Sequence, residues 1–110
     1  MAYSEALADR VRAVMGDDPR LSERKMFGGL CVMVSGHMCV GIVGDELMVR
    51  VGPDGYADAL AHPDAREMDF TGRPMRTMVF VRPVGVATND QLEQWADRGL
   101  EYVASLAPKH

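Results

Sequence analysis

The stretch RKMFGGLCVMVSGHMCVGI, residues 24–42, decides the fold. Two apolar runs, LCVMV and HMCVGIV, flank Ser35-Gly36, a pair that favours a two-residue β-hairpin loop. Both runs are apolar at almost every position, so we expect strands that are covered on both faces, or on one face by a partner chain. The preceding Gly28-Gly29 is expected to bend or bulge the chain between two strands.

Helical patterns lie on either side of this hairpin. Segment 4–15 carries one apolar stripe, with Ser4 as a capping residue and Gly16 at its end. A short middle helix is expected from Pro53 until Pro63 stops it. The last helix is the clearest element, because Thr88 and Gln91 have capping-box spacing ahead of a long apolar stripe.

Further strands complete the expected fold. A short strand is expected at residues 24–27, and ELMVRV alternates like a strand. TMVFVRPV is expected to be a strand that ends at Pro83. REMDFTGRPM is expected to be a turn-rich connection. We therefore expect a single α+β domain over residues 1–110. It has an antiparallel sheet of about five strands, flanked by an N-terminal helix, a short middle helix and a C-terminal helix.

The net charge and the cysteine count of the chain exclude several classes of function. The chain has 110 residues and a formal net charge of −4, which argues against direct, general nucleic-acid binding. Two cysteines are too few for a disulfide framework, and no run has the length of a signal peptide core or a membrane span. We expect a cytoplasmic protein with reduced thiols and no membrane association.

Cys31, His37 and Cys39 are the sharpest candidate for a metal site. Their spacing is C-x₅-H-x-C and no fourth ligand is evident, whereas structural zinc sites use four ligands in paired units. A two-residue loop at Ser35-Gly36 would place Val32 opposite Cys39 and would point Cys31 and Cys39 to opposite faces. We therefore expect buried free cysteines, no metal and no cofactor.

No catalytic constellation stands out. Ser35 lies at a hairpin tip and not in a G-x-S-x-G elbow. Gly28-Gly29 is followed by a strand, whereas a phosphate-binding loop needs more glycines and opens a helix. We expect no catalytic residue.

Arginines offer one candidate binding site. Arg50 and Arg82 lie on predicted strands with the opposite parity to the apolar rows, so they could meet on one sheet face. Together with Arg73, and with Arg76 nearby, they could grip a carboxylate or phosphate. The alternative is that these arginines form ion pairs with neighbouring acids such as Glu67 and Asp69.

Four segments carry a resemblance to a known family. They are KMFGGLCVMVSGHMCVGI, DELMVRVGPDGYADAL, REMDFTGRPM and LEQWADRGLEYVASLAP. In this order and separation they resemble the N-terminal domain of the TfoX/Sxy proteins, over nearly the whole chain. The motif residues are Met26, Phe27, Gly28, Gly29, Gly72, Arg73 and Pro74.

The resemblance implies a fold and a function. The fold is an antiparallel sheet flanked by helices, similar in outline to secretion-chaperone-like domains. The best-known members regulate competence for DNA uptake and act on transcription together with a partner regulator, with no known enzyme activity or catalytic residues. Two-domain members add a C-terminal domain of helix-hairpin-helix character, and this sequence is similar to the N-terminal domain alone.

We therefore expect a small, non-enzymatic regulatory module that binds a protein, in which the partner could be a transcription regulator. The alternative is a small-molecule or anion-binding domain that uses an arginine-lined sheet face. A homodimer is also expected, because two long helices can cover only one face of an apolar sheet. The methionines on the strands, Met33, Met38, Met48 and Met78, would suit such a contact.

Overall fold

The structure is a computed structural model that describes residues 3–26, 28–67 and 77–106. Its elements, in chain order, are α1 (Glu5–Met15), β1 (Leu21–Met26), β2 (Gly29–Val34), β3 (His37–Val43), β4 (Glu46–Arg50), α2 (Gly52–Leu60), β5 (Ala65–Glu67), β6 (Met78–Val81), a 3₁₀ turn η1 (Pro83–Val86) and α3 (Asn89–Ala104). Among these helices, none is long and apolar enough to cross a membrane.

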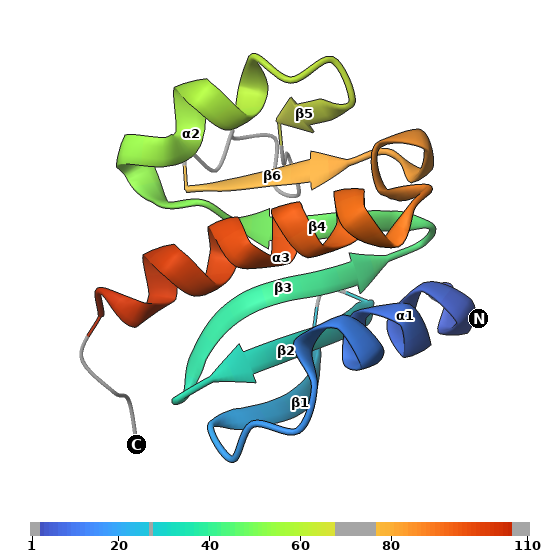
Figure 1. The fold of residues 1–110 in the computed structure, drawn as a ribbon, viewed down its shortest axis with the longest axis vertical. Helices are drawn as coiled ribbons and strands as arrows, with labels where there is room; N and C mark the ends of the chain where they lie inside the picture. Colours follow the sequence, from blue (N-terminus) through green and yellow to red (C-terminus); the bar gives the residue numbers. More distant parts are fainter. Residues whose placement is uncertain (1–2, 27, 68–76, 107–110) are drawn as a thin grey trace.

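The described strands form one antiparallel sheet in the order β1-β2-β3-β4-β6-β5. Figure 1 shows α1 and α3 lying across the same face of this sheet. The α+β prediction with three helices is confirmed. The sheet has six strands where about five were expected, because residues 65–67 pair with β6 instead of belonging wholly to a connection.

Local signals set the ends of the elements. Ser4 accepts a hydrogen bond from the Leu7 backbone N–H, and Thr88 and Gln91 form the expected capping box. Ser35 and Gly36 have φ angles of 51° and 84°. Two consecutive positive φ values match the tight turn that suits the twist of a hairpin, so the predicted β2–β3 hairpin is confirmed.

Cys39 is a β-bulge residue in the middle of β3. Val32 pairs with Val40 and Met33 pairs with Met38, so Cys39 has no partner on β2. The expectation that Val32 faces Cys39 is therefore wrong. The bulge turns Cys39 and Val40 toward the same core while Met38 joins the opposite face.

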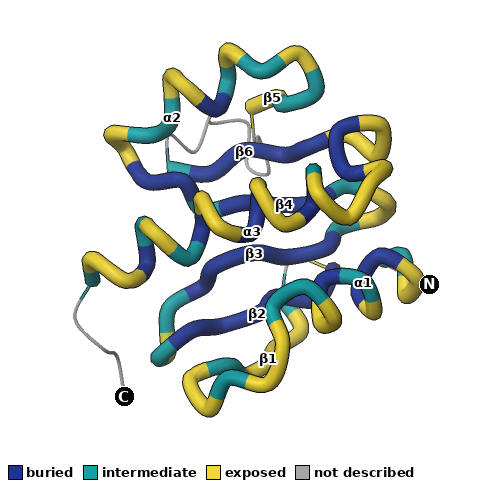
Figure 2. Tube along the Cα trace, in the orientation of Figure 1, coloured by how far each residue is buried: buried dark blue, intermediate teal, exposed yellow. Residues whose placement is uncertain are grey.

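The larger core lies between the sheet and the helices. Its buried side chains come from α1, α2, α3 and one face of the strands, with Val40, Ile42 and Leu92 fully enclosed. Figure 2 shows buried residues running along β2, β3, β4 and β6. Trp95 is 4% exposed in this core and meets the His62 ring edge-on, with 5.2 Å between the ring centres, so it anchors α3.

The opposite face of the sheet holds a second core, here named the sulfur-rich cluster. Its members are Cys31, Met33, Met38, Met48, Met78 and Phe80. Each is at most 9% exposed, and the one large apolar side chain that is exposed among the described residues is Val84. The homodimer was inferred from an exposed apolar sheet face, and this burial contradicts that premise. The oligomeric state itself stays a prediction.

α3 approaches β3 closely at Gly99. A Cβ atom on Gly99 would lie 3.0 Å from Cys39 Sγ and 3.1 Å from the Cys39 carbonyl oxygen. These distances are shorter than ordinary van der Waals contact, and the carbonyl belongs to a central strand that cannot move freely. The missing side chain at Gly99 therefore allows the helix to seat on the bulge.

This contact predicts opposite effects for the same substitution in two helices. Gly99→Ala should lower the free energy of unfolding by about 1–2 kcal/mol, because overpacking outweighs the gain in helix propensity. Gly55→Ala should raise it by about 0.5–1 kcal/mol, because its Cβ would meet Val51 Cβ at an ordinary 3.6 Å. Urea denaturation of both variants measures the difference; stabilisation by both substitutions would contradict the close seating of α3.

Candidate functional site

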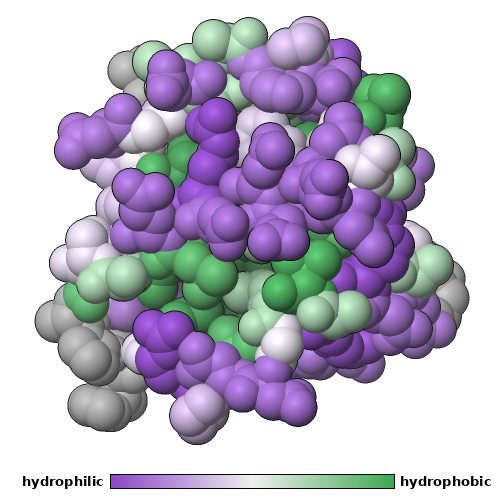
Figure 3. All heavy atoms as spheres, in the orientation of Figure 1, coloured by the Kyte–Doolittle hydropathy of each residue, from purple (hydrophilic) through white to green (hydrophobic). Residues whose placement is uncertain are grey.

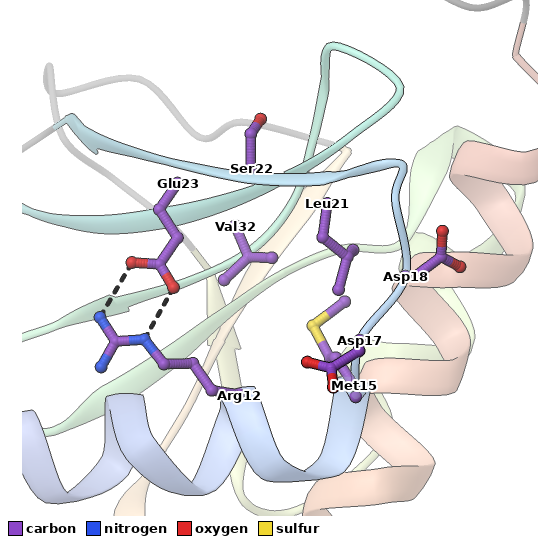
Figure 4. Close-up of a pocket in the computed structure, with 9 residues that line it drawn as sticks. Arg12, Met15, Asp17, Asp18, Leu21, Ser22, Glu23 and Val32 are labelled. Carbon is purple, nitrogen blue, oxygen red and sulfur yellow. Dashed lines mark hydrogen bonds and ion pairs between the residues drawn. The ribbon is translucent and has the colours of Figure 1, made fainter.

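A cleft of about 330 Å³ opens between the C-terminal end of α1 and β1. Its apolar lining comes from Met15, Leu21 and Val32, which belong to α1, β1 and β2. Figure 4 shows Leu21 directed toward Met15, with Val32 between Leu21 and Glu23. Met15 and Leu21 are only partly buried, so an incoming apolar side chain could contact both.

An ion pair closes one end of this cleft. The Arg12 guanidinium donates to both Glu23 carboxylate oxygens, at 2.7 and 2.9 Å, and to Asp9 at 2.8 Å. The hydrogen bond with Glu23 raises the pKa of Arg12, and the same contact lowers the pKa of Glu23. The pair joins α1 to the sheet edge and fixes that wall of the cleft.

The other end of the cleft is acidic. Arg20 neutralises Asp18 through a hydrogen bond of 2.7 Å from its guanidinium. The hydrogen bonds from the Arg20 side chain, and then from its backbone N–H, lower the pKa of Asp18 from 3.8 to about 2. Asp17 is exposed, and no described residue forms an ion pair with it.

The cleft therefore combines an apolar floor with excess negative charge. The charged groups that line it are one guanidinium, of Arg12, and three carboxylates, of Asp17, Asp18 and Glu23. Figure 3 shows hydrophobic surface in a hollow between α3 and the lower edge of the molecule, with hydrophilic groups around it. Such a site suits an apolar group that is flanked by a cation.

A second cleft, of about 480 Å³, lies between α2 and α3. Charged groups dominate its lining, with Asp54, Asp58, Glu101 and Arg98 beside Tyr102. The Arg98 guanidinium carbon lies 4.9 Å from the centre of the Trp95 ring, so this cation already interacts with Trp95. This cleft is larger, and its apolar lining comes from Val51 and Tyr102.

The structure does not bring Arg50 and Arg82 together. Arg50 pairs with Met78 at one end of β4, and Arg82 lies four residues beyond Met78, which is about 13 Å along the strand. Arg50 donates to the Met38 carbonyl at 3.4 Å and lies 5.6 Å from the Tyr102 ring centre. Arg82 donates to the Pro63 carbonyl at 3.4 Å. Arg73, with Arg76, lies outside the described residues.

Part of the expected motif lies at the first hairpin of the sheet. Met26 ends β1 and packs on the sulfur-rich cluster. Gly28 has a φ of +72°, and a Cβ on Gly29 would overlap the Ile42 carbonyl oxygen. These glycines therefore form the expected bend between two strands. The remaining motif residues, Phe27, Gly72, Arg73 and Pro74, lie outside the described residues.

The two cysteines point to opposite faces, as the sequence indicated. Cys31 belongs to the sulfur-rich cluster and Cys39 to the core beneath α3, so they do not form one site with His37. Burial raises the pKa of Cys31, and it raises the pKa of Cys39 to about 12. Both thiols are therefore poor sources of the free thiolate that a catalytic nucleophile requires.

Sequence reasoning missed the cleft beside β1. Arg12 and Glu23 are eleven residues apart and meet only because α1 folds back over the sheet edge. One signal was present: Leu21, Glu23 and Lys25 alternate as one face of a strand, next to a helix that ends in an acidic turn. That alternation would have extended the first strand to Leu21.

Comparison with known proteins identifies the family. The family model described as the TfoX N-terminal domain matches residues 14–103. The chain belongs to the TfoX N-terminal domain family. No curated protein and no solved structure matches the chain.

The family match covers most of the chain, and it confirms the resemblance. All the residues that line the cleft beside β1, except Arg12, fall within the matched segment. The TfoX N-terminal domain here thus contains both the first hairpin motif and the apolar floor of the cleft.

The Asp18–Arg20 pair predicts a shifted titration. The pKa of Asp18 is lower in the folded chain than in the unfolded one, so the pair contributes to stability above about pH 4. That contribution is lost as the pH falls toward 2. NMR titration of the Asp18 carboxyl should show a midpoint near pH 2, and Arg20→Ala should return it toward 3.8.

Arg12→Ala is the matched control, since it removes a guanidinium from the same cleft without touching Asp18. It should leave the Asp18 midpoint in place. The pairing of Asp18 with Arg20 would be contradicted if the Asp18 midpoint stayed the same in Arg20→Ala. It would also be contradicted if Arg12→Ala shifted that midpoint by the same amount.

Proposed function

We propose that this chain is a non-enzymatic regulatory module that binds a protein partner in the cleft beside β1. The observation that carries the proposal is the partly buried apolar floor of Met15 and Leu21 beside the exposed Asp17. Membership of the TfoX N-terminal domain family supports a regulatory role, since its best-known relatives act on transcription with a partner regulator.

The chemistry of the cleft specifies the partner's contact. An apolar side chain would bury surface against Met15 and Leu21, which is the main source of binding free energy at such sites. A neighbouring lysine or arginine would pair with Asp17, and the excess negative charge would speed and orient the encounter. The partner is therefore a protein segment that presents an apolar residue next to a basic one.

The same proposal places the chain in the cytoplasm, where its two free thiols stay reduced, and gives it no direct contact with nucleic acid or membrane. The net charge of −4 supports this choice, because nucleic acids and anionic lipid surfaces both attract basic proteins. Contact with DNA would then be made by the partner regulator.

Charge reversal at the cleft tests the proposal. Tagged wild-type chain, Asp17→Lys and Asp97→Lys should be used to capture proteins from the source cells, with quantification by mass spectrometry. Asp97 is exposed on α3 away from this cleft, so its reversal is a matched change of net charge. We expect a partner to be depleted at least tenfold by Asp17→Lys and retained by Asp97→Lys.

Cross-linking of that partner should map to a segment with an apolar residue beside lysine or arginine. Retention of every partner by Asp17→Lys, equal loss with both variants, or no captured partner would each overturn the proposed use of the cleft.

Self-association is a separate prediction. With the sulfur-rich cluster buried, the longest free sheet edge is β1, which carries Glu23, Arg24 and Lys25, side chains that discourage strand pairing. We retain the homodimer as a proposal, with a contact other than pairing along this charged edge. Sedimentation equilibrium at micromolar concentration should then show twice the 12.1 kDa chain mass, whereas a 12.1 kDa species would exclude it.

A further inference from the structure

The sulfur-rich cluster packs over a glycine, Gly41, and Met48 Cε fills the place where a Gly41 side chain would begin. Cys31, Gly41 and Met48 form one row across β2, β3 and β4, because Cys31 pairs with Gly41 and Gly41 pairs with Met48. Gly41 has no side chain, so the residues on either side of it in the row can approach each other. The adjoining bulge at Cys39 places Met38 on this same face.

Met38 and Met48 both lie near Cys31 in this cluster. Cys31 Sγ lies 3.6 Å from Met38 Sδ. A Cβ on Gly41 would lie 2.7 Å from Met48 Cε and 3.3 Å from Cys31 Sγ, so those two atoms are within about 6 Å of each other. Methionine is unbranched and adaptable, so rotation of Met48 can turn its sulfur toward the other two.

We propose that Cys31, Met38 and Met48 form a binding site for a soft monovalent metal ion, Cu(I). Thiol and thioether sulfurs are the ligands that select Cu(I), whereas Mg²⁺ and Ca²⁺ prefer oxygen. With metal–sulfur bonds of about 2.3 Å, the length of a zinc–thiolate bond, two ligands at a trigonal angle are about 4 Å apart. The observed 3.6 Å between Cys31 Sγ and Met38 Sδ is close to that separation.

Without the ion, the Cys31 thiol donates a weak hydrogen bond to the Met38 thioether. Binding replaces the thiol proton by Cu(I), forms one copper–thiolate bond and two copper–thioether bonds, and releases one proton to solvent. Copper enters and stays as Cu(I), so the step requires no oxidant or reductant. The ligand set differs from Cys31, His37 and Cys39, which the sequence offered, because it uses one face of the sheet only.

The ion can reach the site from the exposed margin of the cluster. Met33 and Met38, each 9% exposed, are its most accessible members, whereas Cys31 is fully buried. Met38 therefore contacts the ion first and transfers it toward Cys31. The surrounding apolar side chains exclude water, which protects a bound Cu(I) from ligand exchange.

The test is an anaerobic titration of the whole chain with Cu(I), in competition with a chromogenic Cu(I) chelator. We expect one ion per chain for the wild type. Met38→Leu and Met48→Leu, which conserve volume, should weaken binding at least tenfold, and Cys31→Ala should abolish it. X-ray absorption of the loaded chain should show sulfur neighbours alone around copper.

Two controls make the result specific. Cys39→Ala removes the other thiol, which faces the core beneath α3, and Met15→Leu removes a thioether from α1. Both should bind copper like the wild type. Failure of the wild type to compete with the chelator, or unchanged binding by Met38→Leu and Met48→Leu, would overturn the proposal, as would loss of binding with Cys39→Ala alone. The methionine variants keep the test decisive if Cys31→Ala does not fold.

Discussion

The side chains of β2 and β3 are buried on both faces of the sheet. Val32 and Val40 point into the core beneath the helices, while Cys31 and Met33 point into the sulfur-rich cluster on the other face. A strand that is buried on both faces has its apolar side chains packed in one core or the other. A change in its register would therefore expose one of the two cores. The remaining elements are arranged around this doubly packed hairpin, with α1 and α3 on one face and β1 and β4 at its sides.

That arrangement also determines where chemistry can occur. The sheet centre is filled, so space for a partner remains at the margin, where α1 ends and β1 begins. Arg12 and Glu23 join these two elements and leave Met15 and Leu21 partly open beside Asp17. Deeper in the sheet, the absence of a side chain on Gly41 lets Met48 Cε and Cys31 Sγ pack close to each other. The proposed partner site and the proposed metal site thus lie in separate parts of one fold.

The sequence predicted what depends on neighbouring residues. Ser4, the Thr88–Gln91 capping box and the Ser35-Gly36 turn act within a few positions, and all three formed as expected. Three features depend on distant pairing and were missed. Residues 65–67 become a strand only by pairing with β6, the bulge at Cys39 follows from the β2–β3 register, and the cleft requires α1 to meet β1. Burial of the methionines was not predicted, because the expected helices could cover only one face of the sheet.

Hydrogen–deuterium exchange of backbone amides tests the doubly packed hairpin most directly. Amides that open only with global unfolding exchange slowest, so we expect the slowest exchange in residues 30–34, 38–43 and 47–49. Amides of β1 and β5, at the sheet edges, should exchange at least tenfold faster. Exchange in β2 and β3 as fast as in β1 would contradict the claim that the two cores close on this hairpin.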